Sequence, residues 1–368
     1  MVKLILAGGG TGGHIYPAIA IANEFKFRFP NSDILFVGTR KGLEKELVSK
    51  NNFKLEFISV RGLARSLKKE LFILPYFLVK SLLESRMVIK KFNPDMVIGT
   101  GGYVSLPVVL MASLMGKKTV IQEQNSYPGL STRILSLIAG RVFLSYQNSA
   151  RYFPFKKKLK VSGNPIRKEI FSGNKEEGLK KFKLEPNKKT VFIFGGSQGS
   201  KNINKAIKEG MEYLKKYENL QFLWQTGSKD FEEIKDFMKS INLVSTVLPF
   251  IQDMASAYAV SDLLVCRAGA LTLAEVTACG KPVILIPYPF ATADHQRYNA
   301  LSLKEKGAAE VILEKELKGE NLAELIVELI RDDNRLKEMS NNAKMLAKPL
   351  ATSQIVDEMV RLLDKEPT

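Results

Sequence analysis

Residues 2–27 read VKLILAGGGTGGHIYPAIAIANEFKF, and the order of the patterns within them indicates the fold. Val2–Leu6 is a short apolar run typical of a buried strand, and Ile15–Phe27 has the apolar spacing of a helix. Gly8–Gly13 lies between them and contains five glycines. A strand, a glycine-rich turn and a helix in direct succession predict the first unit of an α/β fold with a parallel sheet.

The same alternation continues along the chain and restarts after Gly163-Asn164-Pro165. We therefore predict an α/β protein with two Rossmann-like parallel-sheet domains facing a cleft, residues 1–163 and 164–349. The helical segment at about 350–368 is expected to pack back on the first domain. The predicted strands are 2–6, 33–37, 53–60, 95–98, 118–122 and 141–144 in the first domain, and 190–194, 221–225, 246–250, 262–266, 282–286 and 310–313 in the second.

The composition narrows the class of partner. The 368 residues include 55 Lys and Arg against 38 Asp and Glu, a formal charge of +17 that favours an anionic partner. No nucleic-acid-binding motif is present, so a phosphorylated substrate or an acidic lipid surface is preferred to nucleic acid. The two cysteines form no CxxC pair, which argues against a zinc site. No apolar run approaches the roughly 20 residues of a membrane span, and we expect a cytoplasmic protein.

The first glycine loop predicts a phosphate or diphosphate site. Glycines let the backbone approach an anion closely, and the following helix start offers unpaired N–H groups. A merely tight turn would need fewer glycines. Gly8, Gly10 and Gly13 also satisfy G-x-G-x-x-G, and Arg40 could meet a 2′-phosphate, so an NADP-dependent oxidoreductase is an open alternative at this point.

Two further strand-to-helix turns lie in the second half of the chain. Gly195–Ser200 reads GGSQGS, and Cys266–Glu275 reads CRAGALTLAE. Either helix start can hold a phosphate, while Glu275 can accept from ribose hydroxyls or simply stabilise the helix dipole. The chain contains no Asp-x-Asp. Its absence favours a diphosphate held by backbone and side-chain donors.

Six motifs in order make the chain resemble the MurG family, the lipid I N-acetylglucosaminyltransferases of peptidoglycan synthesis. They are GGGTGGH at 8–14, QEQN at 122–125, GNPIR at 163–167, GGSQGS at 195–200, RAGALTLAE at 267–275 and DHQ at 294–296. The resemblance implies a glycosyltransferase-B fold that needs neither a catalytic metal nor another cofactor. It also implies transfer of N-acetylglucosamine, with inversion, from UDP-N-acetylglucosamine to the 4-hydroxyl of an undecaprenyl-diphosphate-linked muramyl pentapeptide. A UDP-N-acetylglucosamine 2-epimerase of the same fold is the rival interpretation, and a non-catalytic anion-binding scaffold is another.

The family's site residues map onto this sequence motif by motif. Thr11, Gly12 and Gly13 would form part of the donor-side cleft and of the acceptor diphosphate pocket. His14 is the candidate general base, with Glu123 as the alternative. Asn125 would contact the transferred sugar, Arg167 and the backbone at Ile251 the uracil end, Ser197 the nucleotide and Gln296 the sugar hydroxyls. The diphosphate and ribose would be held by Ala270, Leu271, Thr272, Leu273, Ala274 and Glu275. Ala268 stands where the family often has serine, which affects only fine donor contacts.

An apolar segment with basic borders predicts contact with an anionic membrane surface. It comprises Lys68, Lys69, Leu71, Phe72, Leu74, Tyr76 and Phe77. Apolar groups can enter the bilayer interface while cations meet acidic headgroups, although a buried helix with a basic rim would look the same. We expect a peripheral protein of the cytoplasmic membrane face, with proteins of cell division and cell-wall synthesis as further partners.

Overall fold

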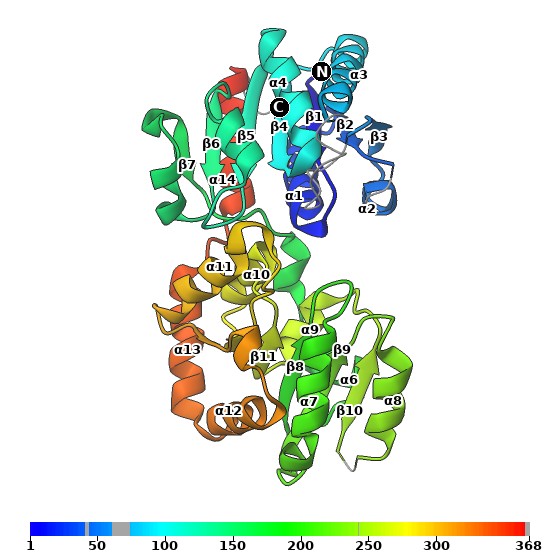
Figure 1. The fold of residues 1–368 in the computed structure, drawn as a ribbon, viewed down its shortest axis with the longest axis vertical. Helices are drawn as coiled ribbons and strands as arrows, with labels where there is room; N and C mark the ends of the chain where they lie inside the picture. The colour runs from blue at the N-terminus through cyan, green and yellow to red at the C-terminus, as the bar shows by residue number, and fades with distance from the viewer. Residues whose placement is uncertain (41–43, 61–73, 242, 365–368) are drawn as a thin grey trace. The chain divides into compact units, whose positions relative to one another are not determined.

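The computed structural model describes residues 1–40, 44–60, 74–241 and 243–364. It contains two compact units (Figure 1). The first comprises Met1–Arg167 together with Lys348–Thr368, and the second comprises Lys168–Ala347. The chain therefore passes between units four residues after the boundary expected at 163/164, and returns two residues before the one expected at 349/350. Each unit is an α/β layer structure, so the predicted fold class is confirmed.

The first unit is built on a seven-stranded parallel sheet in the order β3-β2-β1-β4-β5-β6-β7. Its last strand was not predicted, because it has only three residues and all of them are half-buried. The strands are β1 Lys3–Gly8, β2 Asp33–Gly38, β3 Lys54–Phe57, β4 Met96–Gly101, β5 Lys118–Glu123, β6 Arg141–Leu144 and β7 Leu159–Val161. The helices are α1 Gly12–Arg28, α2 Glu44–Lys50, α3 Leu74–Phe92, α4 Gly102–Leu114, α5 Leu130–Leu135 and α14 Ala351–Leu363, with 3-10 turns η1 Gln147–Tyr152 and η2 Lys156–Lys158.

Helices cover both faces of this sheet. α1 and α14 pack together on one face, where Phe25 and Met359 share a fully buried core (Figure 1). The C-terminal helix is held there by polar contacts as well, since Glu358 pairs with Arg141 and Lys160 at 2.8 Å each. α3, α4 and α5 pack side by side on the other face.

The second unit has a six-stranded parallel sheet in the order β10-β9-β8-β11-β12-β13. Helices cover both of its faces over separate cores, one of which contains the buried Trp224. The strands are β8 Lys189–Phe194, β9 Leu220–Gln225, β10 Ser245–Leu248, β11 Leu263–Cys266, β12 Val283–Leu285 and β13 Ala309–Val311. The helices are α6 Lys175–Lys181, α7 Lys201–Leu214, α8 Phe231–Lys239, α9 Met254–Val260, α10 Ala270–Ala278, α11 His295–Lys304, α12 Gly319–Arg331 and α13 Asp333–Leu346, with 3-10 turns η3 Lys168–Ser172, η4 Thr292–Asp294 and η5 Glu314–Glu316.

The strand order reverses direction once in each sheet, between β1 and β4 and between β8 and β11. Ligands of such sheets bind outside the carboxyl ends of the strands at the reversal point. The glycine loops after β1 and β8 both lie at these points. Topology therefore selects one edge of each sheet for the functional site.

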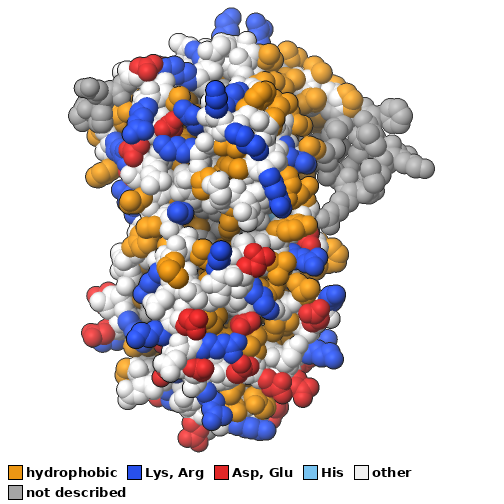
Figure 2. All heavy atoms as spheres, turned by 90° about the vertical axis from the view of Figure 1, so that its left-hand side faces the viewer, with side chains coloured by type: hydrophobic (Ala, Val, Ile, Leu, Met, Phe, Trp, Pro, Cys, Tyr) orange, Lys and Arg blue, Asp and Glu red, His pale blue; other side chains and the backbone are white. Residues whose placement is uncertain are grey.

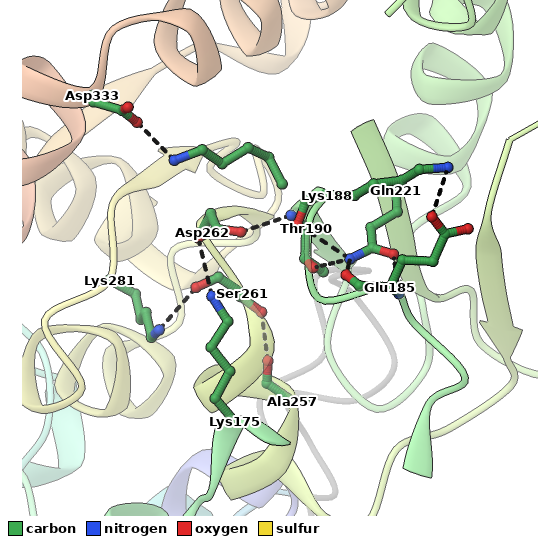
Figure 3. Close-up of polar contacts among 11 residues, drawn as sticks. Lys175, Glu185, Lys188, Thr190, Gln221, Ala257, Ser261, Asp262, Lys281 and Asp333 are labelled. Carbon is green, nitrogen blue, oxygen red and sulfur yellow. Dashed lines mark hydrogen bonds and ion pairs between the residues drawn. The ribbon is translucent and has the colours of Figure 1, made fainter. Parts of the chain in front are cut away.

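The opposite, amino-terminal edges are locked by side chains. Asp95 accepts from the Lys3 amide at 2.8 Å in the first unit, and Asp262 accepts from the Thr190 amide at 2.8 Å in the second. Figure 3 shows the second network, in which Gln221 donates to the carbonyls of Glu185 and Lys188. Because these strand starts already have partners, they offer little to a ligand.

Charge is divided unequally between the units. The first holds 29 Lys and Arg against 13 Asp and Glu, whereas the second holds 26 against 25. Figure 2 shows the result on one face, where blue side chains predominate over the first unit and blue and red are mixed over the second. Nearly all of the excess positive charge thus belongs to the first unit.

Candidate functional site

The first glycine loop leads directly into α1. Thr11 precedes the helix in an extended conformation and makes no side-chain capping bond, and no acid lies in the first turn. Thr11 and Gly13 are exposed. The first N–H groups of α1 and the positive end of its dipole are therefore available to an anion.

A buried acid that the sequence analysis missed supports this loop from behind. Glu44, the first residue of α2, is 1% exposed. Its Oε1 accepts from the Gly10 amide at 3.0 Å and from the Thr39 amide at 3.3 Å. A Cβ at Gly9 would lie 2.1 Å from the same oxygen, so a larger residue there would displace the Glu44 carboxylate. Glu44 fixes the loop's shape, and only the fold brings it there, across 34 residues of sequence.

His14 lies at the reversal point of the first sheet. Its Nδ1 is 3.1 Å from the Thr100 carbonyl oxygen and 3.3 Å from Gln124 Oε1. The ring packs so closely on β4 that a Cβ at Gly101 would lie 2.6 Å from Nδ1. Thr100 adds a second tie, because its hydroxyl donates to the His14 carbonyl at 2.8 Å.

These contacts fix the tautomer of the neutral imidazole. Both atoms that face Nδ1 are acceptors, so Nδ1 must carry the hydrogen. Nε2 then has the free lone pair and has no hydrogen-bond partner within the described part of the chain. Burial lowers the pKa of His14 below 6.5, despite opposing bonds to Gln124 and Thr100. The ring is thus neutral near pH 7 and able to accept a proton.

Glu123, the alternative base, is bound on several sides. Its Oε1 accepts from the amide and side chain of Asn125 at 2.9 and 3.2 Å, and its Oε2 accepts from the Gly129 amide at 3.1 Å. Burial raises the pKa of this carboxyl. The arrangement suits a residue that positions Asn125, a half-exposed member of the candidate sugar site.

The second unit contains a pocket of about 490 Å³ at the carboxyl ends of β8, β11 and β12. The glycine loop after β8, Gly269, Thr272 and Gln296 all line it. Gln296 accepts from the Tyr288 amide at 3.0 Å, which turns its amide group toward the loop before α11. The pocket therefore joins a helix start, a glycine loop and a neutral hydrogen-bonding side chain, as a sugar diphosphate requires.

α10 starts at Ala270, beside this pocket. Its N-cap, Gly269, has no side chain to cap it, and no acid lies in its first turn. Glu275 is the sixth residue of the helix and lies beyond its first turn, so this acid is too far from the helix start to stabilise the helix dipole. Its side chain is 6% exposed and accepts from the Tyr258 hydroxyl at 3.0 Å.

Ile251 is buried, and its amide already donates to Gln225 Oε1 at 2.8 Å. Only the carbonyl of Ile251 is thus available to a base edge such as uracil. Gln225 also donates to the Gly196 carbonyl at 3.0 Å, so its buried side-chain amide connects Ile251 with the glycine loop that carries Ser197. From the sequence, Gln225 is predicted only as the last residue of a strand, and no local signal marks it as part of the site. Ser197 is exposed on the same glycine loop.

The remaining predicted residues lie in the first unit. The Arg167 guanidinium stacks over the Tyr16 ring at 5.0 Å. Tyr76 is 62% exposed on α3, and Phe77 is half-buried against it. The other five membrane residues lie outside the description: Lys68, Lys69, Leu71 and Phe72 entirely, and Leu74 in its side chain. In the described part of the chain, no helix is long and apolar enough to cross a bilayer, and no group of three potential ligands could hold a metal ion.

Comparison with known proteins defines the class. Residues 4–144 match the N-terminal domain of glycosyltransferase family 28, and residues 190–355 match its C-terminal domain. The chain is therefore a glycosyltransferase of two α/β domains. A UDP-N-acetylglucosamine 2-epimerase from Neisseria meningitidis is also similar, with a TM-score of 0.68 over 98% of this chain and 99% of the epimerase. At 16% identity it shares the fold alone.

Closer relatives define the family. Transferases named UDP-N-acetylglucosamine–N-acetylmuramyl-(pentapeptide) pyrophosphoryl-undecaprenol N-acetylglucosamine transferase, from Halothermothrix orenii and Thermodesulfovibrio yellowstonii, are each 43% identical. The matches cover 97% and 99% of this chain, and 98% and 100% of the relatives. The crystal structure of Acinetobacter baumannii MurG is 30% identical, with a TM-score of 0.78 over 98% of this chain and 100% of that one. The chain belongs to the MurG family.

Proposed function

We propose that this enzyme transfers N-acetylglucosamine from UDP-N-acetylglucosamine to the muramyl 4-hydroxyl of an undecaprenyl-diphosphate-linked pentapeptide. Full-length relatives at 43% identity carry this activity in their names, and this similarity is the observation that carries the proposal. The site agrees with it, because each unit has its own glycine loop at a helix start. Two such loops suit two substrates that each contain a diphosphate.

The donor is assigned to the second unit. Its pocket is lined by residues 195, 196 and 198–200 of the glycine loop, by Thr272 and by Gln296. The diphosphate would meet the amides of the loop and of the α10 start, and Gln296 would bond sugar hydroxyls. Glu275 would reach the ribose, and the Ile251 carbonyl would reach the uracil end. Neutral donors suffice for a bound diphosphate when they are oriented in advance.

The acceptor is assigned to the first unit, with its diphosphate at Thr11–Gly13. Nε2 of His14 takes the proton of the 4-hydroxyl as that oxygen attacks the anomeric carbon of the donor. The bond from this carbon to the diphosphate breaks, UDP leaves, and the anomeric configuration inverts. The Thr100 carbonyl keeps the imidazole in the tautomer that this step needs.

A transfer assay tests the proposal. Radiolabel from UDP-N-acetylglucosamine should appear in a short-chain lipid I analogue, and UDP should be released only when this acceptor is present. Glu275→Ala should weaken UDP binding. Acceptor-independent conversion of the donor to its 2-epimer, without labelled lipid, would instead establish the epimerase.

The enzyme is further proposed to bind the cytoplasmic face of the membrane through α3. The exposed side of this helix is apolar, with Tyr76, Val79, Leu83 and Met87 between 55 and 63% exposed. Its buried side includes Ser81 and Ser85 beside Ile89. The helix therefore exposes large apolar side chains and buries two hydroxyl groups, whereas a surface helix usually does the opposite. Arg86, Lys90 and Lys91 are exposed on the same helix, in the unit that carries most of the positive charge. Apolar groups beside cations suit an acidic lipid surface.

Vesicle sedimentation tests this surface. Leu83→Glu/Met87→Glu should lower binding to phosphatidylglycerol-containing vesicles about tenfold or more, since two apolar groups no longer enter the interface. Met345→Glu is the control, because Met345 is 76% exposed on the second unit and should have no effect. Equal binding by the double variant and the parent would exclude α3 from the membrane contact.

A further inference from the structure

Arg267 joins four loops at the carboxyl edge of the second sheet. It follows β11, and its Nη2 donates to the Ser200 hydroxyl at 2.7 Å, at the end of the glycine loop after β8. Its Nη1 donates to the carbonyls of Ile286 and Pro287 at 3.2 and 3.3 Å, just after β12. Nη1 also pairs with Glu314, which follows β13. One guanidinium thus connects the ends of β8, β11, β12 and β13.

The surroundings of Arg267 hold it in this position. Its side chain and that of Glu314 are each 11% exposed. Glu314 also accepts from the Asn202 side chain in α7, and the guanidinium lies 5.4 Å from the centre of the Tyr288 ring. Both charged residues line the donor pocket beside the glycine loop. Arg267 precedes residues 270–275, which are assigned to the diphosphate, and both of its terminal nitrogens already have protein partners.

A planar guanidinium suits such a junction. It presents several N–H donors in fixed directions, so it can hold separate loops in one geometry, whereas an ammonium group offers a single flexible centre. Glu314 balances the charge and competes with an incoming phosphate for Arg267. A site built in this way binds the diphosphate through amides whose positions the guanidinium sets.

We infer that Arg267 and Glu314 form a positioning pair that shapes the donor pocket by tying the glycine loop to the loops after β12 and β13. The inference rests on the proposed donor site. It assigns the pair an indirect role, through Ser200 and the segment at Tyr288, without contact between Arg267 and the donor's phosphates.

Isothermal titration with UDP and steady-state kinetics on the full-length enzyme test the pair. Arg267→Lys should raise the UDP dissociation constant and the donor KM about tenfold, and leave the acceptor KM unchanged. Glu314→Ala should weaken UDP binding in the same direction, because Arg267 then loses its anchor. Arg335→Lys is the matched control: Arg335 pairs with Glu310 and Glu328 in the same unit but does not line the pocket.

Glu314→Ala separates positioning from direct contact. If Arg267 itself bound phosphate, freeing it from Glu314 would tighten UDP binding, and that result would overturn the inference. Unchanged UDP affinity in a folded Arg267→Lys variant, with a melting temperature like that of Arg335→Lys, would overturn it as well. Thr272→Ala and Glu275→Ala keep the two proposals distinguishable, since their failure to weaken UDP binding would reject the donor site itself.

Discussion

His14→Asn isolates the proposed proton transfer from the structural role of the imidazole. The asparagine Nδ2 can occupy the place of His14 Nδ1 and still donate to the Thr100 carbonyl, now 3.1 Å away. The smaller side chain also fits against Gly101, where the ring is tightly packed. What the variant lacks is the lone pair of Nε2.

The expected fall in rate follows from the loss of this lone pair alone. A positioned general base contributes about 10²–10⁴ in rate. We expect kcat to fall by this factor, about 2.7–5.5 kcal/mol of transition-state stabilisation. The UDP dissociation constant should stay within about twofold, because the donor site is assigned to the other unit and the substituted bond is retained.

The pH profile supplies the assay. Burial lowers the pKa of His14 below 6.5, so the base is neutral at higher pH, and kcat/KM should fall as pH drops through that lowered pKa. This acidic limb should disappear in His14→Asn. The only other histidine, His295, bonds the Thr292 carbonyl through Nδ1, so His295→Asn is the control. A general-base role of His14 is refuted if His14→Asn keeps kcat within threefold of the parent, or if Glu123→Gln alone removes the acidic limb.

Two further predictions concern buried acids. Glu44→Ala should raise the acceptor KM about tenfold, because the Gly10 and Thr39 amides lose their acceptor. Glu44→Gln keeps one acceptor oxygen, so its acceptor KM should stay near that of the parent. An equal rise of KM in both variants would exclude the role of Glu44 in shaping the loop. Glu358→Gln should lower the melting temperature at pH 7. The bond from Lys160 lowers the pKa of Glu358, so its contribution is present above 4.5 and is lost as pH falls; calorimetry should show the two melting curves converging below that value.

The fold class and the positions of both glycine loops could be predicted from the amino-acid sequence. Strand, glycine turn and helix are local patterns, because apolar periodicity and backbone freedom are properties of neighbouring residues. The short strand β7 was missed for the same reason, since three half-buried residues carry almost no periodic signal. The six ordered motifs that indicated the family can also be recognised without a structure, because each is a continuous stretch of residues.

The side chains that support these loops could be identified only from the three-dimensional structure. Glu44, at the start of α2, accepts from the Gly10 amide. Gln225 bonds both Gly196 and Ile251. Arg267 pairs with Glu314, which lies 47 positions further along the chain. The structure also oriented the lone pair of His14, through a carbonyl 86 residues away. Such contacts depend on strand order, because parallel strands bring their carboxyl ends together regardless of their separation in the chain. A local pattern can place a loop in the sequence, but the partners of that loop are set by the sheet.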